Sequence, residues 1–292
     1  MFQRLHMLLI LIVSTQIGWA QGRIDCNAMN SRILKAPAHY CVLLPAGYDQ
    51  SPSRKYPVLY FLHGLGGNEQ MLFQSGGWNV VEDLRQKHLI GDFLIVTPEG
   101  KSSFYVNSAD GKTRYSDFFL QEFMPAIEAK YRIQSGRRTR AISGVSMGGY
   151  GAFRFAFAHP ELFAAVSAES AAFMTQSPQE MDAATQSGTQ LGRLIGPVFG
   201  NPIDSVHWRE NSPFILARKN KTALSMQAIY FNCGKDDEFG FENGARAMDH
   251  LLHDLAIKHE FHLYDGNHGT EYFLAHLEEV MKFHSRNFAA LK

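Results

Sequence analysis

The chain has 292 residues, 45% of them hydrophobic, and its 28 basic residues balance its 28 acidic ones. This length suits one α/β domain with a large core, or at most two small domains. There is no basic tract for nucleic acid and no polyacidic tail, so no nucleic-acid partner is expected and charge alone does not select a partner.

Residues 1–20 have the pattern of a secretory signal peptide. Arg4 gives a positive start, residues 8–13 are an apolar run, and small residues stand at −3 and −1 of a cleavage site before Gln21. The alternative is a membrane anchor, but the apolar run is short for a span of about 20 residues. We expect a secreted or periplasmic product without stable membrane insertion after cleavage. Residues 21–292 are expected to form a single domain.

The three cysteines are Cys26, Cys41 and Cys233. Cys26 and Cys41 flank an expected hairpin with its turn near residues 35–37, which makes them plausible cross-strand neighbours. An exported protein permits a disulfide, and a Cys26–Cys41 bridge is left open at this stage. Cys233 ends an apolar strand and is expected to be a buried free thiol. None of the spacings suits a zinc site, and no metal is expected.

After the hairpin, strand-like and helix-like segments alternate. Strands are expected at residues 40–45, 57–62, 92–97, 139–143, 163–168, 226–233 and 260–264. Helices are expected at residues 78–88, 117–131, 150–159, 243–256 and 270–288, with Pro125 kinking the second. This alternation predicts a mainly parallel central sheet with helices on both faces.

Residues 170–220 interrupt the alternation. They are rich in Gln, Ser, Gly and Pro, and they also hold several large aromatic side chains. We expect an insertion of loops and short helices above the sheet, similar to a cap, that walls a substrate pocket.

The motif Gly144-Val145-Ser146-Met147-Gly148 lies between an expected strand and an expected helix. This G-x-S-x-G context is typical of the nucleophile elbow of the α/β-hydrolase fold. The glycines leave room where strand and helix backbones nearly touch, and the serine hydroxyl projects from a strained turn. Ser146 is therefore the expected nucleophile.

A serine nucleophile needs a base, and the base needs an acid that orients it. In this fold the chain order is serine, acid, histidine, with each residue at the end of a strand. His268, after the strand 260–264, is the expected base. The residues Asp236, Asp237 and Glu238 follow the strand 226–233, and proximity in sequence does not choose among them.

The segment His63-Gly64-Leu65-Gly66-Gly67 follows another strand end and matches a loop that lends a backbone N–H to an oxyanion hole. By position, the amides of Leu65 and Met147 are the expected donors. His63 itself is expected to shape the loop.

These segments together resemble the esterase D family of α/β-hydrolases, which includes S-formylglutathione hydrolases, feruloyl and acetyl-xylan esterases and mycolyltransferases. The resemblance runs from Tyr40 to His268. In that family the acid is the third residue after the glycine of a segment similar to Gly234-Lys235-Asp236-Asp237, which implies Asp237. The loop at residues 63–67 departs from the glutathione-specific branch, and this favours an exported carboxylesterase.

The predicted function is hydrolysis of carboxylic esters through an acyl-enzyme, without metal or organic cofactor. The substrate is expected to be a small or polysaccharide-linked ester, and no oligomeric state is predicted. One alternative is acyl transfer to a carbohydrate or lipid alcohol, which product analysis with an added acceptor would detect. Another is a non-catalytic binding protein on a hydrolase scaffold, which would not react with a fluorophosphonate.

Overall fold

A computed structural model describes residues 22–289. The expected signal peptide, residues 1–20, lies outside the described residues and stays a prediction, as do the single domain at residues 21–292 and the cap at residues 170–220. The strands are β1 (Arg23–Ser31), β2 (Ala36–Leu44), β3 (Val58–Leu62), β4 (Leu94–Pro98), β5 (Arg140–Val145), β6 (Ala165–Glu169), β7 (Ala228–Gly234) and β8 (Glu260–Tyr264).

These strands form one eight-stranded sheet in the order β1-β2-β4-β3-β5-β6-β7-β8. Strands β3 to β8 are parallel to one another, whereas β2 pairs antiparallel with both β1 and β4. The mainly parallel sheet with an N-terminal hairpin is therefore confirmed. Because the parallel strands all end at one edge, the loops that follow them gather there.

The helical segments are α1 (Met71–Gln74), α2 (Gly77–Gln86), α3 (Tyr115–Phe118), the π-helix η1 (Phe119–Phe123), α4 (Met124–Lys130), the 3₁₀-helix η2 (Arg137–Thr139), α5 (Met147–Ala158), α6 (Pro178–Gln186), α7 (Gln190–Phe199), α8 (Ser205–Asn211), α9 (Pro213–Lys219), α10 (Lys221–Leu224), α11 (Phe241–Asp254) and α12 (Thr270–Ala289).

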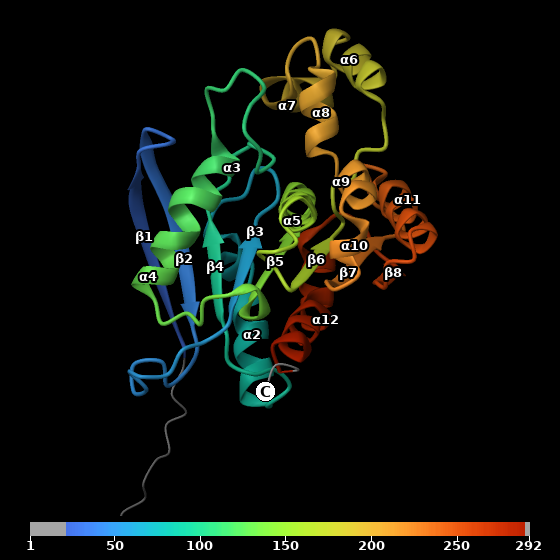
Figure 1. The fold of residues 1–292 in the computed structure, drawn as a ribbon. Helices are drawn as coiled ribbons and strands as arrows, with labels where there is room; N and C mark the ends of the chain where they lie inside the picture. Colours follow the sequence, from blue (N-terminus) through green and yellow to red (C-terminus); the bar gives the residue numbers. More distant parts are fainter. Residues whose placement is uncertain (1–21, 290–292) are drawn as a thin grey trace, which may run out of the picture.

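Helices cover both faces of the sheet (Figure 1). One face packs against α3, α4, α5 and α11 in the larger core cluster, and the other packs against α2 and α12 in a second cluster. The central strands β3 and β6 are buried along their whole length, and β5 is buried except at its first residue, Arg140, as a parallel sheet covered on both faces requires. No helix within residues 22–289 combines the length and apolar character that a membrane crossing needs.

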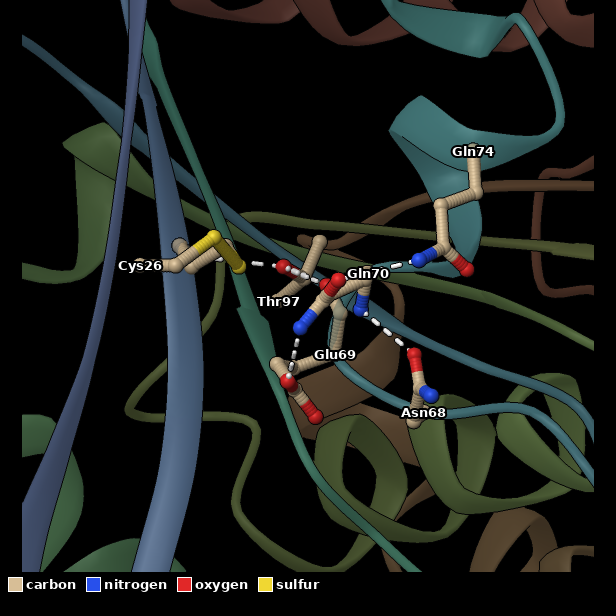
Figure 2. The surroundings of a disulfide bond; sticks show 7 residues. Cys26, Asn68, Glu69, Gln70, Gln74 and Thr97 are labelled. Atoms are coloured by element: carbon tan, nitrogen blue, oxygen red, sulfur yellow. Dashed lines mark hydrogen bonds between the residues drawn. A yellow bond between two sulfur atoms is a disulfide. The ribbon is translucent and has the colours of Figure 1, made fainter.

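The disulfide between Cys26 and Cys41 is present and joins directly paired positions of β1 and β2. The hairpin turn lies at residues 32–35, slightly before the expected position. Figure 2 shows that Thr97 of β4 lies beside this bridge. Its hydroxyl is 3.3 Å from the Cys41 carbonyl oxygen and 2.6 Å from that of Glu69. The disulfide-linked strand is therefore connected, through Thr97, to the loop that follows β3.

The expected helix at residues 117–131 is divided into three parts, with a π-helical turn at Phe119–Phe123. Proline has no N–H, and its ring crowds the carbonyl four residues earlier. A π-turn that ends two residues before Pro125 accommodates this change by widening the helix, where a simple kink was expected.

Residues 170–220 hold α6 to α9. Figure 1 shows α6, α7 and α8 beyond the end of the sheet toward which β3 and β4 point. More of this segment is helical than its polar composition indicated, because side-chain caps from Ser177, Thr189 and Asp204 begin three of these helices.

Candidate active site

Ser146 lies in a turn of one residue between β5 and α5. Its backbone has φ +55° and ψ −118°, a sparsely populated conformation for a residue with a β-carbon. A β-carbon added at Gly148 would lie 2.0 Å from the Leu62 carbonyl oxygen, and one added at Gly144 would lie 2.3 Å from the carbonyl carbon of Gly148. Both glycines are therefore needed for the close approach of β3, β5 and α5. The helix begins at Met147, three residues earlier than expected.

His268 lies in the loop between β8 and α12 and contacts Ser146 directly. Its Nε2 is 2.9 Å from Ser146 Oγ, and its Nδ1 is 2.7 Å from Asp237 Oδ2. Asp237 comes from the loop after β7. Three loops at one edge of the sheet thus bring together a hydroxyl, an imidazole and a carboxylate in a continuous hydrogen-bonded chain.

The Asp237 side chain is completely buried. Burial alone would raise its pKa, but the hydrogen bond and charge of His268 and the amides of Phe239 and Phe241 outweigh burial, so its pKa lies below the usual value. The Phe239 amide donates to Asp237 Oδ1 at 3.0 Å. This environment favours the ionised carboxylate of Asp237. The carboxylate can accept a hydrogen bond from the protonated Nδ1 of His268 and so fix the orientation of the ring.

The two neighbours of Asp237 point elsewhere. Asp236 is exposed, and Glu238 accepts a hydrogen bond from the backbone amide of His268 at 2.9 Å. Of the three acidic residues that the sequence left open, only Asp237 contacts the imidazole among the described hydrogen bonds.

Three aromatic rings surround His268, a feature that was not predicted. Phe239, Phe241 and Phe273 meet it edge to face, with centroids 4.9, 5.3 and 5.4 Å away. Phe239 and Phe241 belong to the acid loop and the start of α11, so their proximity in sequence to Asp237 was the available signal. Phe273 is brought in by the first turn of α12.

The loop after β3 lies against Ser146, because a β-carbon added at Gly64 would lie 3.3 Å from that of Ser146. His63 braces this loop: its Nε2 accepts from the Gly100 amide and its Nδ1 lies near the Gly64 carbonyl oxygen, each at 2.7 Å. Burial lowers the pKa of His63, in keeping with a neutral ring that donates from Nδ1. Within residues 22–289, no acceptor is bonded to the amides of Leu65 and Met147.

Two cavities meet at Ser146, His268 and Leu65. The larger, about 730 Å³, is walled by residues 172–176 and by Phe239 and Phe241. Residues of the segment 170–220 thus contribute a wall, as expected. The smaller, about 210 Å³, lies between the ends of β3 and β5 and helices α1 and α12. In the described part of the chain, no group of three or more His, Cys, Asp or Glu side chains is arranged to hold a metal ion.

The family of this chain follows from comparison with known proteins. The model of the Esterase family matches residues 31–284, and the chain belongs to this family. The resemblance to esterase D relatives is thereby confirmed.

Two curated relatives show how far the likeness extends. Esterase Rv1288 of Mycobacterium tuberculosis is 30% identical over 244 residues, which are 78% of this chain and 51% of that protein. The chain thus spans about half the length of that relative. The acetyl esterase of Caldicellulosiruptor saccharolyticus is 24% identical over 265 residues, covering 88% of this chain and 96% of the relative.

Solved structures confirm the α/β-hydrolase fold. A ferulic acid esterase is similar with a TM-score of 0.78 and 27% identity, covering 91% of this chain and 99% of that one. The fluorophosphonate-binding serine hydrolase FphF of Staphylococcus aureus gives a TM-score of 0.75 at 22% identity over the same shares and shows the fold alone.

Proposed function

We propose that this chain is an exported serine carboxylesterase. The observation that carries the proposal is the hydrogen-bonded chain from Asp237 through His268 to Ser146, at distances of 2.7 and 2.9 Å. In this arrangement Ser146 is placed as the nucleophile, His268 as the base and Asp237 as the acid that orients the base. Membership of the Esterase family supports ester bonds as the target.

In the proposed acylation step, Ser146 Oγ attacks the ester carbonyl carbon while His268 Nε2 takes the hydroxyl proton. The carbonyl oxygen becomes an oxyanion that accepts from the amides of Leu65 and Met147. The bond to the alcohol oxygen then breaks, and His268 returns the proton to this leaving group. Asp237 stabilises the imidazolium that exists between the two transfers.

In the second step, water attacks the acyl-enzyme. His268 takes a proton from the water, the bond between the acyl carbon and Ser146 Oγ breaks, and the proton passes to the serine. The products are the free acid and the free enzyme. The proposed route uses only these side chains and amides.

The larger cavity is proposed to receive the bulkier half of the ester. Its walls are mainly apolar, with an exposed Phe239 at 65%, and such a surface suits the face of a sugar or an aromatic ring. The acetyl esterase and ferulic acid esterase relatives favour acetyl or ferulic acid esters as substrates. The Cys26–Cys41 disulfide favours a protein that folds outside the reducing cytoplasm.

The decisive experiment compares purified wild type with Ser146→Ala. We expect wild type to hydrolyse 4-nitrophenyl acetate and to react with a fluorophosphonate probe. The variant should lose the labelling and at least about 10⁴-fold in kcat while keeping its circular dichroism spectrum. Wild-type turnover in a folded Ser146→Ala protein would refute the assignment, and a wild type that neither labels nor hydrolyses any ester would favour a binding protein.

A further inference from the structure

The smaller cavity beside Ser146 contains a buried acid that the proposed mechanism does not use. Glu169 ends β6, lines this cavity and is only 1% exposed. Its backbone carbonyl accepts from the Ser146 amide at 2.9 Å, so the residue is fixed directly beside the nucleophile. Within residues 22–289, neither of its carboxyl oxygens has a hydrogen-bond partner.

Among residues 22–289, no basic side chain acts on the pKa of Glu169. Asn232 faces it from β7. The amide oxygen of Asn232 accepts from Tyr272, and one of the two N–H groups of its amide donates to the Tyr230 hydroxyl. The second N–H group lies close enough to Glu169 to oppose the rise of its pKa, but it makes no hydrogen bond to either carboxyl oxygen. Burial raises the pKa of Glu169 well above its usual value, Asn232 opposes the rise, and the charge of Glu279 adds to it. Burial therefore favours the protonated form of Glu169, which has one O–H to donate and a carbonyl oxygen to accept.

The rest of the cavity is mainly apolar. Its walls include Phe61, Leu72, Val145, Leu274 and Leu277. A buried polar group without a partner is costly in such a place. An unpartnered acid at the wall of a cavity that opens onto the nucleophile thus points to a partner supplied by the substrate.

The volume of the smaller cavity limits the size of the substrate group that can carry a hydrogen-bond partner for Glu169. About 210 Å³ corresponds to roughly seven water molecules at about 30 Å³ each. A short acyl chain fits this space, whereas a sugar chain requires the larger cavity on the other side of Ser146.

We propose that Glu169 is a specificity-determining residue that selects short acyl groups bearing a hydroxyl, by hydrogen bonding to that hydroxyl in the smaller cavity. The inference rests on the proposed esterase function, because only in an acyl-enzyme is the acyl group of the ester bonded to Ser146 and so placed beside the smaller cavity. The acyl hydroxyl takes the place of the missing partner, and an unsubstituted chain leaves the carboxyl unsatisfied.

The test uses two 4-nitrophenyl esters that differ only in the hydroxyl, 3-hydroxybutanoate and butanoate. The measured quantity is the ratio of their kcat/KM values on the same preparation, which does not depend on the fraction of folded enzyme. Relative to wild type, Glu169→Leu should lower this ratio about tenfold, because the substrate hydroxyl loses its partner. Glu169→Gln keeps a neutral donor and acceptor and should retain most of the preference.

Ser75→Ala is the matched control in the same cavity. The Ser75 hydroxyl already donates to the Leu72 carbonyl at 3.2 Å, so its removal should leave the ratio unchanged. An unchanged ratio in Glu169→Leu, or a loss produced by Ser75→Ala instead, would overturn the proposal. A preference found only for hydroxylated alcohols, measured with ethyl and 2-hydroxyethyl acetates, would also overturn it.

These failures are distinguishable from failure of the proposed function. If hydrolysis of both esters depends on Ser146 and the ratio of their kcat/KM values is the same in wild type and Glu169→Leu, only the specificity proposal is wrong. If hydrolysis persists in Ser146→Ala, the catalytic assignment itself is wrong.

Discussion

Ser146 is held in a conformation that costs about 1–3 kcal/mol, and three backbone hydrogen bonds fix it there. Its amide donates to the Glu169 carbonyl, and its carbonyl accepts from Tyr150 and Ala172 at 3.1 Å each. The nucleophile is thus anchored to β6, to α5 and to the segment after β6. Hydrogen bonds to three parts of the chain therefore stabilise the strained backbone conformation of this one residue.

The neighbouring aspartates Asp236 and Asp237 allow a paired test of the orienting acid. Asp237→Asn keeps the size of the side chain but favours the wrong imidazole tautomer, so we expect a loss of about 10⁴-fold in kcat. Asp236 is exposed, so Asp236→Asn should change kcat less than about tenfold. Steady-state kinetics of both variants decide the assignment. A severe loss in Asp236→Asn would mean that the wrong carboxylate was chosen.

Glu169 also affects the pH dependence of stability. Its pKa is raised well above 4.5 in the folded protein, whereas the unfolded chain releases this proton near pH 4.5. Between the unfolded and the folded pKa, the folded state binds more protons, so the free energy of unfolding decreases as pH rises. The stability linked to this proton is complete below about pH 4.5.

We therefore expect Glu169→Gln, which has no proton to release, to gain melting temperature relative to wild type as pH rises. Thermal unfolding of both proteins at pH 4, 6 and 8 measures this difference, in which other titrating groups cancel. A difference that is the same at all three values would contradict a raised pKa for Glu169.

At the scale of elements, the sequence predicted most of the sheet. Apolar runs such as residues 58–62 and 93–96 predict strands that are buried in a sheet covered on both faces. The segment 115–130 was predicted less well. Its aromatic residues fit a helical period, but the π-turn depends on how Pro125 and the buried rings of Phe119 and Phe123 pack, which periodicity does not encode.

The disulfide closes a short loop, with a sequence separation of 15 residues. The double substitution Cys26→Ser, Cys41→Ser should lower the free energy of unfolding by about 3 kcal/mol. Urea unfolding of the oxidised wild type and the double variant measures the change. Cys233→Ser is the single-cysteine control at the free thiol, and the reduced wild type should match the double variant. Equal midpoints for oxidised and reduced wild type would contradict the prediction.

At the scale of the whole molecule, the position of the candidate site was predictable. Parallel strands end at one edge, so Ser146, Asp237 and His268 were expected to converge there in that chain order. One wall of the larger cavity was expected from residues 170–220, but the other walls and the smaller cavity were not predictable, because they come from segments far apart in sequence. Glu169 was overlooked for the same reason, although a carboxylate that ends an apolar strand was a visible signal.

Export is the prediction that concerns the complete chain. Expression of residues 1–292 should yield a secreted or periplasmic product whose mass starts at or near Gln21. Leu9→Arg with Leu11→Arg interrupts the apolar run and should leave the uncleaved protein inside the cell. Intact-mass measurement of both fractions checks this. A wild-type product that retains residues 1–20 would indicate an anchor or a protein that stays inside.

The connection from Cys41 through Thr97 to Glu69 implies an order of events during maturation. Glu69 is four residues after Leu65 in the loop that borders Ser146, and Thr97 holds its carbonyl. In a reducing compartment β2 is secured by hydrogen bonds alone, whereas oxidation ties it covalently to β1. We expect the loop after β3 to reach its final conformation only after the Cys26–Cys41 disulfide has formed. If the protein is exported as proposed, the requirement for the Cys26–Cys41 disulfide would delay full esterase activity until the chain has reached an oxidising compartment.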